Sequence, residues 1–165
     1  MEEIFSKELI ADRISALGRS ITDFYAGKDL TIIVLMNGGA FFGCDLARAI
    51  DLPLWFDSIR AASYVNDVRG GKVALASALK LDPAGREILL VDDVFDSGET
   101  VKECKQHLLD LGAAGVRCAV LVNKKIAGRD SEPEWAAFEA PDKYLVGFGM
   151  DSREVYRNLP FVGVM

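Results

Sequence analysis

The residues of this chain best suited to chemistry are three closely spaced carboxylates, Asp92, Asp93 and Asp96. They follow the apolar run 88–91 and precede a Ser-Gly turn, so a buried strand is expected to end in a tight loop at a helix N-terminus. Backbone N–H groups of residues 97–100 can converge there on an anion, helped by the positive end of the helix. Carboxylates beside a phosphate repel it unless they bind hydroxyl groups, a bridging Mg²⁺ or a proton in transfer. The pattern therefore predicts a site for a sugar phosphate rather than for bare phosphate.

The same residues also have a structural explanation, in which the acids solvate a strand end and cap a helix. Asp and Ser are favoured at helix N-caps, and an isolated Asp-Ser-Gly sequence is usually explained in this way. The full pattern is longer: four apolar residues, two acids, two apolar residues and then Asp-Ser-Gly-Glu-Thr. That length favours a ligand site over a simple cap.

The elements that position these acids repeat along the chain as strand, loop and helix. Apolar residues at helical spacing from Ile10 to Phe24 predict an opening helix that ends near Gly27. The β-branched run Leu30–Met36 predicts a strand. Behind it, Asn37-Gly38-Gly39 predicts either a plain turn or a place where a ligand can approach the backbone.

After the acidic loop, a helix is expected from Val101 to Leu111, closed by Gly112, and then a strand over Val116–Val122. Lys124 follows this strand directly, so it is expected near the acidic loop. There its positive charge either offsets the charge of the carboxylates or contacts a polar substrate, or the side chain is simply solvated in a loop. Strands alternating with helices predict an α/β fold with a mainly parallel twisted sheet flanked by helices. Ligands bind such sheets beyond the carboxyl ends of the strands, which is where both loops fall.

The middle of the chain is less regular. Leu52–Phe56 is a candidate strand, which Ser58–Tyr64 either continues or bends away from. The polar, Gly-rich stretch 65–72 is interpreted as a mobile lid over a reacting site or as a plain surface hairpin. Short strands are expected at 73–76 and 79–81.

The C-terminal part, from about residue 131 to residue 165, does not continue the alternation of strands and helices. It is expected to form a small flap, or hood, over the site together with the final strand. Its aromatic residues are either core under a loop or, at Tyr144, a flat face for a stacked base. At 165 residues the chain fits a single domain, 1–165.

Composition and charge limit the classes of partner. The chain has 19 basic and 25 acidic residues and a net charge of -6, which argues against a general attraction to nucleic acid or to an anionic membrane. No apolar run approaches the roughly 20 residues that span a bilayer. Three cysteines without metal-ligand spacing, and first residues without a signal-peptide layout, predict reduced thiols in a cytoplasmic protein.

These features occur in the order found in one enzyme family. The acidic loop 87–100, the Gly-Gly loop and the tail 141–151, continued by 156–164, resemble the hypoxanthine-guanine phosphoribosyltransferases over nearly the whole chain. The acidic loop alone is similar to the phosphoribosyl diphosphate (PRPP) motif of type I phosphoribosyltransferases, which adenine and orotate enzymes also carry. PRPP synthetases have a similar motif in much longer chains. The tail is therefore the more specific part of the resemblance.

The resemblance implies a role for each matching residue. Asp92 and Asp93 hold the ribose 2′ and 3′ hydroxyl groups, and Asp96 handles the proton on the purine N7. Asp151 ligates Mg²⁺, the implied cofactor. The other implied roles are the 5′-phosphate cradle at Asp96, Ser97, Gly98, Glu99 and Thr100; pyrophosphate binding at Asn37, Gly38, Gly39, Arg157 and, by a weaker match, Arg129; purine binding at Lys124, Tyr144 and Leu145; and the start of a lid at Ser63 and Tyr64.

The implied activity is purine salvage, the transfer of a 5-phosphoribosyl group from PRPP to hypoxanthine or guanine, giving the nucleoside monophosphate and pyrophosphate. The implied partners are these small molecules and, in a homodimer or homotetramer, further copies of the chain. Asn37 stands where the family usually has Lys, and Asp92 stands where it more often has Glu. Two alternatives stay open: a xanthine-preferring enzyme, and a regulator with the phosphoribosyltransferase fold that binds RNA or senses nucleotides.

Overall fold

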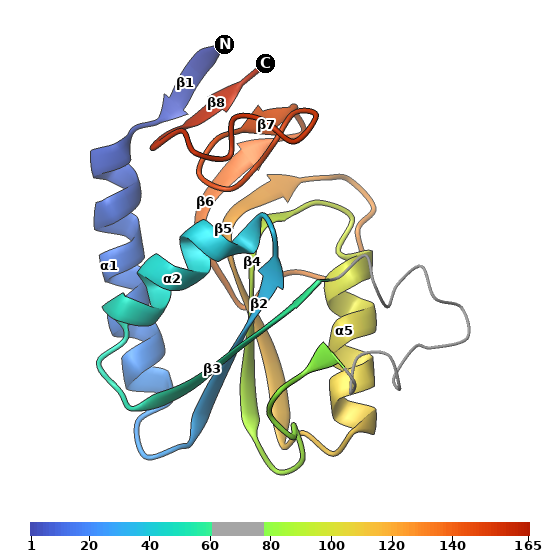
Figure 1. Ribbon diagram of the computed structural model, residues 1–165. Helices are drawn as coiled ribbons and strands as arrows, with labels where there is room; N and C mark the ends of the chain where they lie inside the picture. The colour runs from blue at the N-terminus through green and yellow to red at the C-terminus, as the bar shows by residue number, and fades with distance from the viewer. Residues whose placement is uncertain (61–77) are drawn as a thin grey trace.

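The apolar runs that predict strands lie side by side in one parallel sheet (Figure 1). The computed structural model describes residues 1–60 and 78–165. Its main sheet has the strand order β3-β2-β4-β5-β6, and each neighbouring pair is parallel. The carboxyl ends of these strands therefore meet at one edge of the sheet. The strands are β2 (Leu30–Met36), β3 (Leu54–Arg60), β4 (Glu87–Phe95), β5 (Gly115–Lys125) and β6 (Trp135–Pro141).

Helices cover both faces of this sheet because each of them carries an apolar stripe (Figure 1). α1 (Lys7–Phe24) and α2 (Gly39–Ala49) pack on one face, and α5 (Glu99–Asp110) packs on the other. Successive side chains of a strand point to opposite faces. Accordingly Val34 joins the core cluster under α1 and α2, while its neighbour Ile33 joins the cluster under α5.

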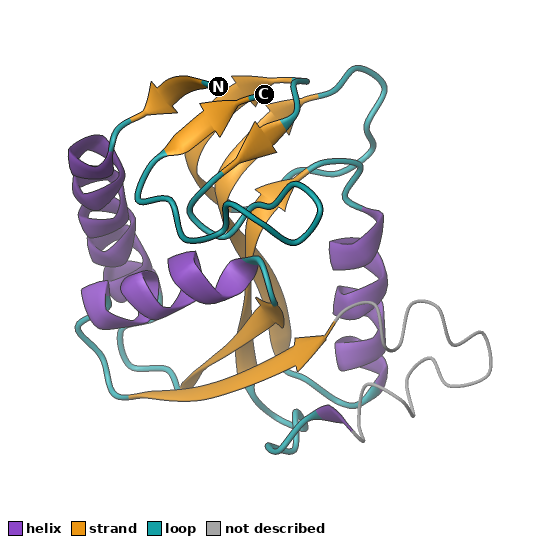
Figure 2. Ribbon diagram, turned by 45° about the horizontal axis from the view of Figure 1, so that its top comes forward, coloured by secondary structure: helices purple, strands orange, loops and turns teal. Residues whose placement is uncertain are grey.

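A second sheet forms the hood above the carboxyl edge of the main sheet (Figure 2). Its strand order is β1-β8-β7 and both pairs are antiparallel, so the last strand of the chain lies between the first strand and β7. Phe5 of the hood stacks on Phe138 of β6 with ring centroids 4.0 Å apart, which joins the two sheets. The hood strands are β1 (Glu2–Phe5), β7 (Leu145–Val146) and β8 (Val162–Val164).

The expected α/β architecture is confirmed, and the structure corrects it at two places. Trp135–Pro141, expected within the hood, is the edge strand of the main sheet and runs parallel to β5. Residues 79–81 are not a strand. The N–H groups of Lys80 and Leu81 instead donate to Asp57 Oδ2 at 2.7 and 2.9 Å, so a carboxylate takes the donors that a sheet ladder would need.

Several expectations for the middle of the chain lie outside the described residues. They concern Ser63, Tyr64, the lid 65–72 and the strand 73–76. Just before them, the candidate strand at 52–56 is present as β3 and continues to Arg60. Within the described part of the chain, no helix combines the length and the apolar character needed to cross a membrane.

Candidate active site

The acidic pair stands near the end of β4, against the loop that precedes α2. Asp93 is 8% exposed. Asp92 Oδ1 accepts the N–H of Asp93 at 2.9 Å, and Asp93 Oδ1 accepts the N–H of Val94 at 2.8 Å. Burial raises the pKa of both carboxyl groups, and the adjacent Asp93 charge raises the pKa of Asp92 further. Carboxyl groups in this setting gain from a ligand that donates hydrogen bonds or positive charge.

Glycines let the loop before α2 approach this pair closely, and they let the hood approach that loop. A Cβ atom on Gly38 would collide with the Asp93 carboxylate, and one on Gly39 would lie 2.9 Å from the Val91 carbonyl oxygen. From the hood, Gly149 has φ +105, and a Cβ atom there would collide with the Gly38 carbonyl oxygen. The backbone at Gly38 is therefore held between the acidic strand end and the hood.

The chain passes from β4 into α5 through a tight turn at Ser97 and Gly98. Gly98 has φ +82, and a Cβ atom there would lie 2.7 Å from the Phe95 ring, so only glycine fits. Ser97 Oγ accepts the N–H of Glu99 at 3.3 Å. The turn lines a cavity of about 80 Å³ at the positive end of α5, which favours an anion. The lining residues are Asp92, Val94, Phe95, Asp96, Ser97, Gly98, Thr100 and Val101.

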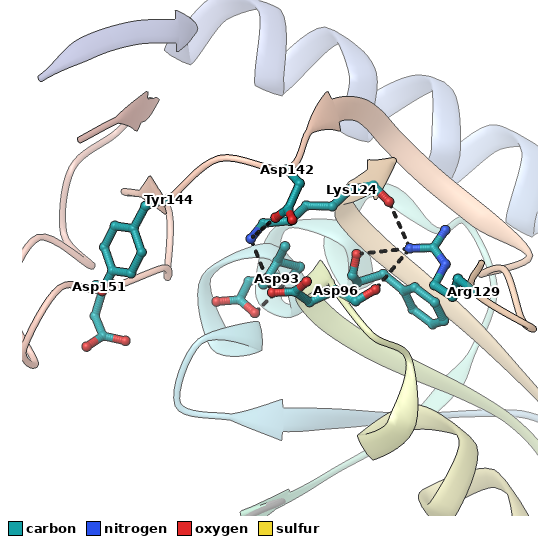
Figure 3. A network of polar contacts seen from close by, with 9 residues as sticks. Asp93, Asp96, Lys124, Arg129, Asp142, Tyr144 and Asp151 are labelled. Carbon is teal, nitrogen blue, oxygen red and sulfur yellow. Dashed lines mark hydrogen bonds and ion pairs between the residues drawn. The ribbon is translucent and has the colours of Figure 1, made fainter. Parts of the chain in front are cut away.

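Lys124 reaches the same edge from β5 and is held between two carboxylates (Figure 3). Its Nζ lies 3.1 Å from Asp96 Oδ2 and 3.5 Å from Asp142 Oδ1. Lys124 is only 9% exposed. A largely buried ammonium group with one more N–H to donate is suited to a carbonyl oxygen of a ligand.

A second, larger cavity of about 200 Å³ opens between Lys124 and the hood. It adjoins the smaller cavity, because both are lined by Val94 and Asp96. A ligand with a planar group at one end and an anionic group at the other can therefore extend from one cavity into the other. The larger cavity is lined by Asp93, Val94, Asp96, Lys124, Tyr144, Leu145, Met150 and Asp151.

Tyr144 and Asp151 form the hood side of the larger cavity (Figure 3). Tyr144 is 57% exposed, and its hydroxyl donates to the Asp151 carbonyl oxygen at 3.2 Å. Asp151 Oδ1 pairs with Arg157 Nη2 at 2.9 Å, and Arg157 Nη1 donates to the Gly149 carbonyl oxygen at 2.7 Å. Arg157 also lowers the pKa of Asp93, against the larger upward effect of burial, so this cation acts on the acidic pair.

The carboxylates that line the larger cavity are suited to a metal ion that takes some of its ligands from the protein and the others from a bound substrate. Among the described residues, no group of three or more acidic, histidine or cysteine side chains could form an all-protein metal site. Mg²⁺ usually takes one or two protein carboxylates and completes its shell with water and substrate phosphate oxygens. Asp151, which lines the larger cavity opposite Asp93, fits that kind of binding.

Arg129, which the resemblance offered as a pyrophosphate ligand, is turned into the protein. Its side chain is 3% exposed. All three of its nitrogen atoms donate to acceptors of the adjoining strands and loop. The structure therefore corrects this assignment, because the guanidinium group is already used.

The other predicted site residues in the described part of the chain meet at the carboxyl edge. Asn37 is exposed beside Gly38, and Glu99 is exposed at the start of α5. Sequence reasoning missed Asp142 and Met150. Asp142 was detectable as a carboxylate within the specific tail, whereas nothing in the sequence distinguishes Met150 from a core methionine.

Comparison with known proteins gives a consistent result. The model of the phosphoribosyl transferase domain matches residues 1–153. The chain is 34% identical to a hypoxanthine-guanine phosphoribosyltransferase of Lactococcus lactis, over 98% of this chain and 89% of that protein. It is 32% identical to the bifunctional protein TilS/HprT of Listeria monocytogenes, over 98% of this chain but only 25% of that protein. A crystal structure of a hypoxanthine phosphoribosyltransferase from Staphylococcus aureus superposes with a TM-score of 0.87 at 27% identity, covering 99% of this chain and 92% of that one.

Proposed function

The chain belongs to the phosphoribosyl transferase domain family, and from this premise we propose that it is a purine salvage enzyme. The proposed reaction transfers the 5-phosphoribosyl group of PRPP to hypoxanthine or guanine, giving IMP or GMP and pyrophosphate. The observation that carries the proposal is the pair of adjoining cavities, one at the anion-binding end of α5 and one between Lys124 and the hood. A nucleoside monophosphate has its phosphate, ribose and base in the matching order.

The larger cavity suits a 6-oxopurine because such a base carries O6 and N7 on one edge of its ring. Lys124 Nζ would donate to O6. Asp96 Oδ2, which lies 3.1 Å from that Nζ, would then be within reach of N7 and could hold its proton. Tyr144 offers an exposed aromatic face on which the base can stack. The backbone of Leu145, on the same wall, would meet the edge of the base.

The acidic pair and the Gly-Gly loop suit the sugar and the leaving group. Displacement of pyrophosphate from the ribose C1 develops positive charge on the sugar and negative charge on the leaving group. Asp92 and Asp93 would hold the ribose hydroxyl groups and tolerate the cationic sugar. The backbone N–H groups of Gly38 and Gly39, together with Arg157, would hold the pyrophosphate as its charge grows.

We further propose that Mg²⁺ binds Asp151 together with oxygen atoms of the substrate. The ion would supply neutralisation of the leaving group's negative charge. Arg157 already pairs with Asp151, so both cationic partners of the pyrophosphate would lie on the hood side of the acidic pair.

We also propose that the protein is cytoplasmic and forms a homodimer or a homotetramer. It is proposed to bind neither nucleic acid nor membranes. The exposed apolar side chains of Phe41 on α2 and of Trp55 and Phe56 on β3 support a contact between subunits. The net charge of -6 supports a protein that does not bind nucleic acid through general electrostatics.

One assay tests the activity. Purified protein is supplied with PRPP and Mg²⁺, and hypoxanthine, guanine, xanthine and adenine are offered in turn while nucleotide formation is followed by chromatography. Nucleotide from hypoxanthine or guanine is expected. Faster turnover of xanthine would select the xanthine-preferring alternative. No nucleotide from any 6-oxopurine would exclude the enzyme, and salt-sensitive retention of RNA in that case would favour the regulator.

A further inference from the structure

Arg129 places a buried guanidinium group directly behind the two side chains that would meet the purine. Its Cζ lies 4.7 Å from the centre of the Phe95 ring, and its side chain is 3% exposed. Burying a cation to this degree is unfavourable unless its N–H groups are bonded. The acceptors are the carbonyl oxygens of Phe95, Asp96, Lys124 and Ser131 and the side chains of Asn123 and Glu132.

Two of these acceptors are the backbone carbonyl groups of Asp96 and Lys124 themselves (Figure 3). Arg129 Nη1 donates to the Asp96 carbonyl oxygen at 3.1 Å and to the Lys124 carbonyl oxygen at 2.8 Å. The ladder between β4 and β5 ends one residue earlier in each strand, at the pair Phe95 and Asn123. The guanidinium group therefore continues the connection between the two strands at the point where the ladder stops.

We infer that Arg129 is a positioning residue for the proposed transfer, which sets the distance between Asp96 and Lys124 by holding the carbonyl groups of both. The inference rests on the proposed function. One purine edge must meet the Asp96 carboxylate and the Lys124 ammonium together, and these groups lie 3.1 Å apart. A displacement of about 1 Å in such a pair can lower a rate on the order of 10²-fold.

Two other roles for Arg129 make different predictions. A guanidinium group that bound pyrophosphate would change the affinity for PRPP and pyrophosphate when it is replaced. A guanidinium group that only stabilised the loop would lower the melting temperature and leave the turnover of folded molecules unchanged. A positioning residue lowers kcat in folded protein while the 5′-phosphate cradle, built from the backbone after Asp96, still binds.

The test uses Arg129→Lys and Arg129→Gly, with Arg48→Lys as the matched control. Lysine keeps the charge but cannot bond several carbonyl groups as a planar fork does, so kcat is expected to fall roughly 10²-fold. The KM for PRPP and the inhibition by pyrophosphate should stay close to those of the parent. In Arg129→Gly, low concentrations of guanidinium chloride should restore part of the lost turnover, whereas sodium chloride should not. Arg48 is exposed on α2 and pairs with Asp45 in the same helix, so its replacement should leave turnover unchanged.

Each contrary result is distinct. The inference would be overturned if folded Arg129→Lys kept the parental kcat, or if the variant lost only affinity for PRPP and pyrophosphate. It would also be overturned if the loss of activity equalled the unfolded fraction measured by circular dichroism. A parent that forms no nucleotide would count against the proposed function instead. The inference would then be judged on GMP binding by calorimetry: weaker binding to Arg129→Gly that guanidinium restores supports it, and equal binding by parent and variant overturns it.

Discussion

Asp96 lines both cavities, as Val94 does, and its carboxylate pairs with Lys124. Replacement of Asp96 by Asn removes a group that can take up and return a proton, so kcat is expected to fall by roughly 10² or more, the usual scale for general acid–base groups. The KM for PRPP should change little, because the backbone forms most of the phosphate cradle. Steady-state kinetics with hypoxanthine and PRPP varied separately will measure both.

Asp130→Asn is a suitable control for this variant. Asp130 is an exposed carboxylate that pairs with Lys102 and lines neither of the two cavities. Equal turnover in Asp96→Asn and in the control would remove Asp96 from the proton-transfer role.

The raised pKa of Asp92 predicts how the stability of the ligand-free protein depends on pH. Burial raises its pKa above the ordinary value of 3.8, so as pH rises past 3.8 the unfolded chain releases this proton before the folded protein does. The folded state therefore loses stability as pH rises from 3.8 toward the raised pKa that Asp92 has in the folded protein. Asp92→Asn removes that loss, so the variant should melt above the parent near neutral pH, and the difference should shrink toward acid pH.

Thermal melts of the parent and Asp92→Asn from about pH 4 to about pH 8 will check the sign of this dependence. Asp45→Asn, which replaces a partly exposed carboxylate on α2, serves as the control. A constant difference between parent and Asp92→Asn across the range would show that the carboxyl group is not protonated in the folded protein.

Among the elements, the hood packs closely on the loop before α2 at Gly149. Gly149→Ala should destabilise the protein in two ways, since its φ of +105 disfavours a side chain and the added Cβ would collide with the Gly38 carbonyl oxygen. Gly27 is the matched control, because it has φ +77 and nothing within 4 Å of an added Cβ. Gly27→Ala should lose only the backbone term of about 1–2 kcal/mol, and Gly149→Ala about 1–3 kcal/mol more.

Urea unfolding of both glycine variants gives this comparison directly. The KM for PRPP should also rise in Gly149→Ala alone, because Gly38 belongs to the proposed pyrophosphate loop. Equal losses of stability in the two variants would mean that the hood does not pack on that loop in solution.

The sequence predicted best those elements that are specified by a pattern of neighbouring residues. Leu30–Met36 is a continuous β-branched and apolar run, and its boundaries are those of β2. Trp135–Pro141 falls within the part of the chain expected to form the hood, but it is the edge strand of the main sheet. An edge strand has a neighbour on one side only, and it can therefore tolerate a charged residue such as Glu139. The pairing of β1 with β8 joins short strands from opposite ends of the chain, and no local pattern specifies such a contact.

At the scale of the whole molecule, the proposed purine site lies against a sheet that strands from both ends of the chain form. Gly163 lies in β8 and pairs with Glu3 on one side and Val146 on the other. Gly163→Pro removes a ladder donor from this central strand, which weakens the hood by about 1 kcal/mol or more. The KM for hypoxanthine is therefore expected to rise roughly tenfold, since 1.4 kcal/mol corresponds to a factor of ten.

The KM for PRPP should rise less in Gly163→Pro, because the phosphate cradle belongs to the main sheet. Glu2→Ala, which keeps the backbone pairing of β1 with β8, is the control. An unchanged KM for hypoxanthine in a folded Gly163→Pro protein would mean that the hood does not form the base site.

The candidate site was predictable from sequence where its residues are contiguous. The acidic loop and the tail each carry their polar residues within one short stretch, and the parallel fold then places both at one edge. The sequence offered Arg157 and, by a weaker match, Arg129 for the same role, and it did not show that their environments differ. Arg157 faces the acidic pair and Arg129 is buried among carbonyl groups, and this difference depends on contacts between β4, β5 and the loop that follows β5.

The pairing of β1 with β8 also has a mechanical consequence. Glu2 is paired with Val164, so the residues nearest the two ends of the chain face each other, and both ends leave the hood at the same place (Figure 1). Tension applied between the ends therefore acts across the strands and loads their hydrogen bonds one after another, as in a zipper, rather than all together. A chain pulled by its ends would lose the hood first and keep the parallel sheet, with the proposed phosphate cradle, until later.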